Sequence, residues 1–303
     1  MIFGNGLKRA SALSLALGLS GCSVQHWAVD KAGDALAGNS AVVATDDDPD
    51  FVRAAAPFSL KLMESLLAQD PGHPQLLLAA TSGFTQYSYA FVQLDADILE
   101  DQDYKAASHL HERARRLYLR ARNYGLQGLE ARHPHLRETL RRDPQAAAGL
   151  LRASDVPLVY WTAVAWAAAI SQAKDEPDLV GDLPQVDALA ASASSLDADY
   201  GAGALQTFLI SYEMARQARP DVARAHFDRA ISLSKGHSAA PFVALAESVC
   251  VAQRARAEYL TVLDQAVAID AERFPDNRLE NLIEQRRARW LRDRVDELFL
   301  ENP

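Results

Sequence analysis

Apolar residues recur along this chain at the spacing of amphipathic helices. In residues 71–91, Leu77, Phe84, Phe91 and the apolar positions between them lie three or four residues apart, which places them on one face of a helix. Alternating runs of β-branched residues, which would predict strands, are scarce. The pattern therefore predicts an all-α protein.

Spacings typical of tetratricopeptide repeats occur at several places in the chain. The first helix of such a repeat carries one large residue, two small residues and one aromatic residue at a fixed spacing. The same spacing is found for Leu77, Ala80, Thr81 and Phe84. The spacing of a second helix occurs in residues 114–121, 223–230 and, more weakly, 259–266. Because one helical hairpin cannot bury its own apolar face, we expect the hairpins to stack into a solenoid or toroid.

One apolar segment is inserted between these repeat-like copies. Residues 155–173 are apolar on nearly every side, yet shorter than the ~20 residues that a membrane-spanning helix needs. We therefore interpret the segment as a helix buried among others. Tyr160, Trp161 and Trp166 point in different directions around it, so its faces either belong to the core or line an internal cavity.

Residues 1–21 have the features of a lipoprotein signal peptide. Lys8 and Arg9 precede a short apolar run, and Leu-Ser-Gly-Cys at its end resembles a bacterial lipoprotein box. In such a box Cys22 is acylated and becomes the new N-terminus. Several acyl chains would anchor the protein firmly in a membrane. Serine, not aspartate, follows Cys22, which favours the inner leaflet of the outer membrane, facing the periplasm.

The leader divides the chain into three parts. Residues 1–21 are the signal peptide, residues 22–48 the lipidated segment and tether, and residues 49–303 a helical-repeat domain. With Cys22 carrying lipid, only Cys250 remains, so no internal disulfide is possible. The apolar surroundings of Cys250 in the sequence predict an inert core residue.

Charge and motifs argue against several classes of function. The formal net charge is −9, and removal of the leader makes it more negative, which argues against nucleic-acid binding. No nucleophile elbow, zinc-protease motif or phosphate loop is present. His133 and His135 lie in a predicted turn and are close enough to share an ion, but no cluster of acids or cysteines adjoins them. We expect no enzyme activity, no cofactor and no metal.

The C-terminal helix carries the densest set of polar candidates. Asn277, Asn281 and Gln285 lie four residues apart and form an amide stripe. Arginines beside an aromatic residue then interrupt the apolar face. Two interpretations stay open: a solvated face balanced by Glu280 and Glu284, or a contact with a partner or ligand. The candidate residues are Asn277, Arg278, Asn281, Gln285, Arg286 and Trp290.

Four stretches together resemble the TatT component family of TRAP transporters. They are residues 58–92, 114–134, 238–251 and 276–291, and the likeness extends over residues 48–291. The resemblance implies a periplasmic lipoprotein of tetratricopeptide-like hairpins that forms a homotrimer. It further implies association with the substrate-binding (P) component of a tripartite ATP-independent transporter. A pore or cleft through each protomer would pass ligand to that partner.

The resemblance carries no catalytic residues. Recurrent segments of the family correspond to residues 83–91 and 277–290, which adds Phe84, Tyr87, Tyr89 and Phe91 to the candidates for a pore or partner contact. We therefore expect a lipid-anchored, non-enzymatic scaffold that binds a solute-binding protein and a small organic or apolar ligand. The main alternative is a generic repeat lipoprotein that serves outer-membrane or envelope assembly. An enzyme on a helical toroid is the second alternative.

Overall fold

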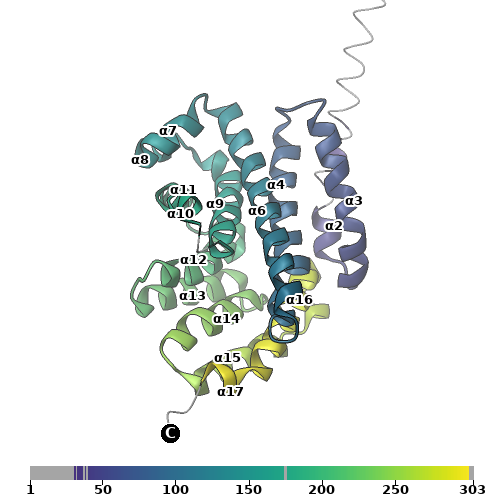
Figure 1. The fold of residues 1–303 in the computed structure, drawn as a ribbon, viewed down its shortest axis with the longest axis vertical. Helices are drawn as coiled ribbons and strands as arrows, with labels where there is room; N and C mark the ends of the chain where they lie inside the picture. The colour runs from purple at the N-terminus through teal and green to yellow at the C-terminus, as the bar shows by residue number, and fades with distance from the viewer. Residues whose placement is uncertain (1–30, 32, 37, 39, 174–175, 300–303) are drawn as a thin grey trace, which may run out of the picture.

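All regular elements in the described part of the protein are helices (Figure 1). The computed structural model describes residues 31, 33–36, 38, 40–173 and 176–299. Within these ranges no strand occurs, so the prediction of an all-α protein is confirmed. The predicted signal peptide and the lipidation site Cys22 lie outside the described residues.

Most of the chain is arranged in α-helices joined by short turns. The α-helices are α2 (Ser40–Ala44), α3 (Pro49–Leu67), α4 (Pro74–Ser88), α5 (Leu94–Leu99), α6 (Tyr104–Arg132), α7 (Leu136–Arg142), α8 (Pro144–Ala148), α9 (Val156–Ser171), α10 (Pro177–Val180), α11 (Leu183–Leu196), α12 (Ala204–Ala215), α13 (Pro220–Ser234), α14 (Ala240–Leu245), α15 (Arg256–Ala268), α16 (Arg278–Asp293) and α17 (Val295–Leu298). Four 3-10 turns are η2 (Ala153–Asp155), η3 (Tyr200–Gly203), η5 (Ala271–Arg273) and η6 (Pro275–Asn277). Two further turns are π-helical, η1 (Tyr89–Gln93) and η4 (Ala246–Cys250).

Local chemistry explains where several helices begin. The Asp48 carboxylate accepts hydrogen bonds from the backbone N–H groups of Asp50 and Phe51, and Pro49 occupies the first helical position of α3. The imidazole of His73 accepts from the backbone N–H of Leu76 and caps α4 in the same way. The helix predicted for residues 71–91 therefore begins at Pro74 and continues through the π turn η1.

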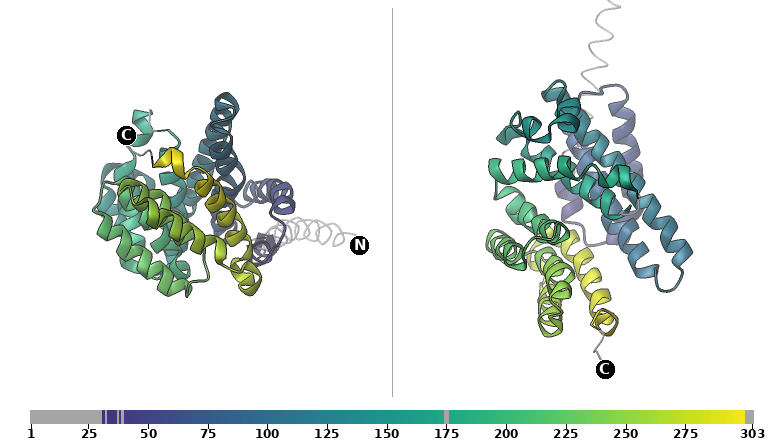
Figure 2. Two further views of the ribbon diagram at one scale, coloured as in Figure 1. Left: turned by 90° about the horizontal axis from the view of Figure 1, so that it is seen from below. Right: turned by 60° about the vertical axis from the view of Figure 1, so that its left-hand side comes forward.

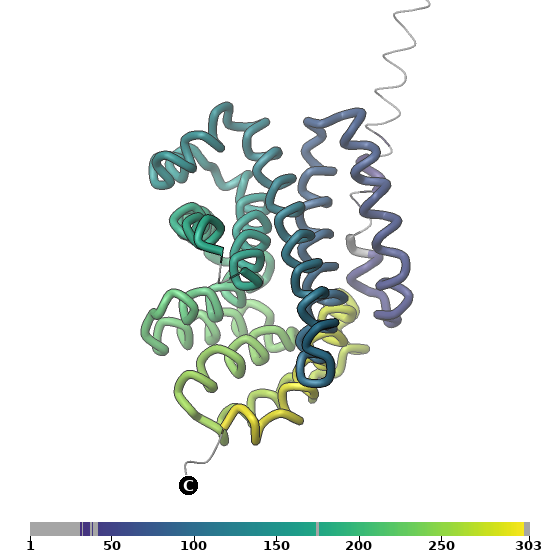
Figure 3. Tube along the Cα trace, in the orientation of Figure 1, coloured from purple at the N-terminus to yellow at the C-terminus, as the bar shows by residue number. Residues whose placement is uncertain are grey.

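Helices that follow one another in the sequence pack side by side. Helix α4 contacts α6, α6 contacts α9, and α9 contacts α11. Further along the chain, α12 contacts α13, α14 contacts α15, and α15 contacts α16. The last long helix, α16, also contacts α2 and α3. The C-terminal part of the helical domain therefore returns to its N-terminal part, as Figures 1 and 2 show for the yellow and purple helices. The same path can be followed along the tube in Figure 3.

Helix α9 is the centre of the largest apolar core. Its buried residues pack with α6, α11 and α12. Glycines of α6 allow α9 to approach α6 closely, because a Cβ atom at Gly125 would lie only 2.1 Å from the hydroxyl of Thr162 in α9. Ala153–Ser171 is long and apolar enough to cross a membrane by length and composition, so the expectation that it is too short was wrong. Of the 18-residue apolar part of this segment, 61% is buried within the fold, as in a core helix.

Candidate functional site

A buried group of charged and polar side chains joins α16 to both π turns. This group, the inner cluster, comprises Tyr89 of η1, Asp97 of α5, Glu247 of η4, and Glu284 and Arg287 of α16. The Arg287 guanidinium donates to both Glu247 oxygens at 2.8 and 2.6 Å and to Asp97 Oδ2 at 2.8 Å. The Tyr89 hydroxyl donates to Glu284 Oε2 at 3.2 Å. The cluster thus connects elements separated by about 190 residues of sequence.

Burial sets the protonation states of the inner cluster. Burial by itself lowers the pKa of Arg287, but the charge of Glu247, followed by Tyr89 and Asp97, outweighs it and raises that pKa well above its ordinary value. Burial also raises the pKa of Glu284 to about 8, against the opposing effect of Arg287. Glu284 therefore carries a proton at neutral pH while Arg287 is charged.

The two π turns contribute side chains to the same place. Each π turn widens its helix by one residue, and such turns are frequent at functional sites. Tyr89 is the first residue of η1 and Glu247 the second of η4, and both approach Arg287, whose guanidinium lies 5.7 Å from the Tyr89 ring centroid. The convergence of both turns on one arginine marks this region as a candidate functional site.

A second carboxyl group of α16 extends the inner cluster towards α9. Glu280 lies one turn before Glu284 and accepts a hydrogen bond from the Ser238 hydroxyl at 2.7 Å. Its side chain is accessible to solvent, yet surrounding protein raises its pKa. The pKa of Tyr160 in α9 is raised by burial and further by the charge of Glu280.

The predicted amide stripe of α16 binds backbone groups. Asn281 is fully buried; its side chain accepts from the backbone N–H of Ala239 and donates to the carbonyl of His237, both at 2.9 Å. The Gln285 amide donates to three carbonyls at the end of α15, the shortest distance being 2.6 Å to Ile269. These two amides fix α16 against α14 and α15.

Asn281→Ala is expected to lower the free energy of unfolding by roughly 2–4 kcal/mol, because it leaves a buried donor and a buried acceptor unpaired. Urea unfolding followed by circular dichroism measures the change. Asn277→Ala is the matched control, since Asn277 makes no side-chain capping bond and its loss should change stability by about 0.5 kcal/mol or less. Equal effects of the two substitutions would contradict a role for Asn281 in holding α16.

The remaining predicted residues lie in three settings. Phe84 and Phe91 are buried in apolar clusters, and Tyr87 packs beside both. Tyr160 and Trp161 form one aromatic group with Tyr200 and Phe208, whereas Trp166 donates to Asp182 at 3.2 Å. On α16 and the turn before it, Asn277 is half-buried, Arg278 pairs with Glu272, Arg286 with Asp95, and Trp290 lies under Arg287 and Arg294.

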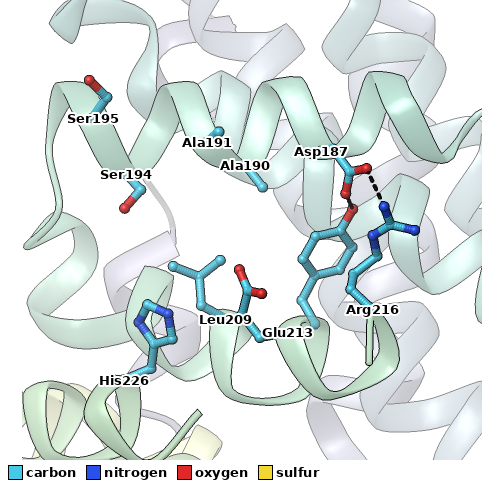
Figure 4. A pocket seen from close by; sticks show the side chains of 10 residues that line it. Asp187, Ala190, Ala191, Ser194, Ser195, Leu209, Glu213, Arg216 and His226 are labelled. Atoms are coloured by element: carbon cyan, nitrogen blue, oxygen red, sulfur yellow. Dashed lines mark hydrogen bonds and ion pairs between the residues drawn. The ribbon is translucent and has the colours of Figure 1, made fainter. Parts of the chain in front are cut away.

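An open groove lies between α11 and α12, away from the inner cluster (Figure 4). This α11–α12 groove has a volume of about 610 Å³ and reaches His226 of α13. No spacing or motif in the sequence predicted this groove. Cys250 lies elsewhere, buried in η4, and burial raises the pKa of its thiol to about 12. Among the described residues no group of His, Cys, Asp or Glu is arranged to hold a metal ion.

Comparison with known proteins places these features within one family. A family model described as TRAP transporter T-component matches residues 45–299. An uncharacterized protein of Treponema pallidum (strain Nichols) is 31% identical over 268 residues, which cover 86% of this chain and 83% of that protein. The match to the family includes all helices from α3 to α17, and with them the inner cluster and the α11–α12 groove.

Proposed function

The chain belongs to the TRAP transporter T-component family, and from this premise we propose that it associates with the substrate-binding (P) component of such a transporter. The T-component is an accessory, envelope-associated part of a transporter and not a known enzyme family. The observation that carries the proposal is the family match over residues 45–299, nearly the whole described domain. A small organic or apolar ligand would pass between the two proteins.

The interior of the protein supports a ligand path. Glu280 is exposed although surrounding protein raises its pKa, and its charge contributes to the raised pKa of Tyr160 in α9. Trp161 packs edge-on against Tyr160, and Tyr89 bonds Glu284, one turn along α16 from Glu280. We infer that this part of the interior belongs to an internal passage through a toroid of helices, closed where α16 meets α2 and α3. The other predicted aromatic residues, Phe84, Tyr87, Phe91 and Trp166, would then support its wall.

Anchoring follows from the predicted lipoprotein box. Acyl chains on Cys22 would hold the protein at the inner leaflet of the outer membrane, facing the periplasm. The predicted tether of residues 22–48 would join the acylated cysteine to the helical domain. We further propose that the protein acts as a homotrimer, as the family resemblance implies.

Helix α3 offers a surface for the P component. Phe51, Phe58 and Leu62 lie on one face, and their exposed fractions are 65%, 74% and 39%. Exposed apolar residues that share a helix face are typical of protein–protein contacts. We therefore propose that this face, the α3 stripe, contacts the partner protein.

Replacing Phe51 and Phe58 together by serine is expected to reduce capture of the P component by about tenfold or more, because aromatic anchors dominate such interfaces. The thermal midpoint should change little, since both side chains are exposed. Val222→Ser is the control, because Val222 is an exposed apolar residue of α13 with an exposed fraction of 39%. Loss of self-crosslinks with unchanged P-component capture would assign the α3 stripe to the homotrimer, and no change in either would exclude both roles.

Crosslinking in intact cells tests the proposed function as a whole. The lipidated protein is recovered through a C-terminal tag, and the proteins attached to it are identified. A periplasmic solute-binding protein together with self-crosslinks is the expected result. Capture of outer-membrane assembly or cell-wall proteins would favour the alternative, a repeat lipoprotein that serves as a scaffold for the envelope.

A further inference from the structure

The α11–α12 groove is lined by side chains of three helices. Helix α11 supplies Asp187, Ala190 and Ala191, helix α12 supplies Leu209 and Glu213, and helix α13 supplies His226. Figure 4 shows Asp187 beside Arg216 at one end, His226 at the other, and Glu213 between them. The groove therefore has two polar ends and an apolar stretch formed by alanine and leucine.

The charge of Asp187 is already balanced by its neighbours. The Tyr212 hydroxyl donates to Asp187 Oδ1 at 2.6 Å, and Arg216 Nη2 donates to Oδ2 at 2.7 Å. Both carboxylate oxygens are thus hydrogen-bonded, and the guanidinium neutralises the charge. This end of the groove does not require a ligand of either sign.

His226 presents a hydrogen-bond acceptor at the other end. The Gln206 amide nitrogen donates to the carbonyl of Ala198 at 2.6 Å, which leaves Gln206 Oε1 facing His226 Nδ1 at 2.7 Å. Because Oε1 is an acceptor, Nδ1 must carry the proton. Burial lowers the pKa of His226, so the ring is neutral and Nε2 keeps its lone pair.

Glu213 is the unbalanced charge of the groove. Its side chain makes no ion pair or hydrogen bond among the described residues, although it is only half-exposed. Its charge acts on His226, whose pKa it raises against the larger effect of burial. The groove thus offers an unpaired carboxylate and an imidazole acceptor beside apolar side chains.

We propose that the α11–α12 groove binds a primary ammonium group carried on a short aliphatic chain. An ammonium group donates three hydrogen bonds and accepts none, which matches Glu213 and the free nitrogen of His226. The methylene groups would pack on Ala190, Ala191 and Leu209. This site is independent of the proposed ligand path, because its residues belong to α11, α12 and α13 and not to the inner cluster.

Two sources of this chemistry are possible, a free aliphatic amine and the lysine side chain of another protein. Isothermal titration calorimetry of the full chain with 1,4-diaminobutane and with 1-butylamine tests whether the groove binds a free amine. We expect saturable binding of both amines, no binding of 1-butanol, and at least a tenfold loss of affinity in Glu213→Gln. The matched control is Asp228→Asn, an exposed carboxylate of α13 outside the groove, which should retain the affinity.

Carbodiimide crosslinking in intact cells tests whether the groove binds a lysine side chain of another protein, because the reagent joins a carboxylate directly to an adjacent lysine. A crosslink that maps to Glu213 without binding of the free amines would identify a protein lysine as the ligand. Absence of both signals, equal binding of 1-butanol, or unchanged amine affinity in Glu213→Gln would overturn the proposal. Long-range 1H–15N NMR adds an independent check, since a His226 ring protonated on Nε2 would remove the proposed acceptor.

Discussion

Arg287→Met is expected to lower the free energy of unfolding by about 3–5 kcal/mol near pH 8, because it removes a buried cation that two partly buried carboxylates share. The Arg287 side chain is 9% exposed and pairs with Asp97 and Glu247 at 2.8 and 2.6 Å. Methionine retains much of the aliphatic packing, so the loss measures mainly the uncompensated charges. Urea unfolding followed by circular dichroism measures the free energy of unfolding of both proteins.

An exposed ion pair of the same helix provides the control for this prediction. Arg292 pairs with Asp264, and the two side chains are 52% and 55% exposed. Arg292→Met should therefore change stability by about 1 kcal/mol or less. A loss of stability in Arg287→Met no larger than that in Arg292→Met would contradict a role for Arg287 in balancing Asp97 and Glu247.

Local rules predicted several of the long helices of this protein. Apolar spacing located α4, α6 and α9 because each buries one face or, for α9, nearly its whole surface. The start of α3 likewise depends on local chemistry, because the Asp48 carboxylate accepts from backbone N–H groups two and three residues later. These features depend on residues within a few positions of one another, so the sequence contains all the information that they need.

The inner cluster could not be predicted in the same way. The amide stripe indicated the right helix, α16, but the predicted candidates did not include Glu284 or Arg287 as members of a buried site. Their partners come from residues far away in the sequence, and both π turns that supply Tyr89 and Glu247 lie inside apolar helical segments. Spacing alone does not distinguish a charge that pairs across the fold from one on a solvated helix face.

Glu284→Gln is expected to remove a large part of the pH dependence of stability between about pH 4.5 and 8. Burial raises the folded-state pKa of Glu284 to about 8, against an ordinary value of 4.5. Between these values the folded protein binds a proton that the unfolded chain does not, so stability falls as the pH rises. The linked free energy is on the order of 5 kcal/mol. Glutamine stays neutral and still accepts from the Tyr89 hydroxyl.

The variant and the wild-type protein should therefore have similar stability near pH 5, and the variant should be the more stable one near pH 9. Urea unfolding at both pH values measures the difference, with Glu297→Gln as control because that side chain is 61% exposed. An unchanged pH dependence, or a variant less stable than the wild-type at pH 9, would mean that Glu284 is ionised beside Arg287. When Glu284 is neutral, the charge of Arg287 is left to balance Asp97 and Glu247. The proton on Glu284 therefore keeps the charge of the proposed ligand path from becoming more negative.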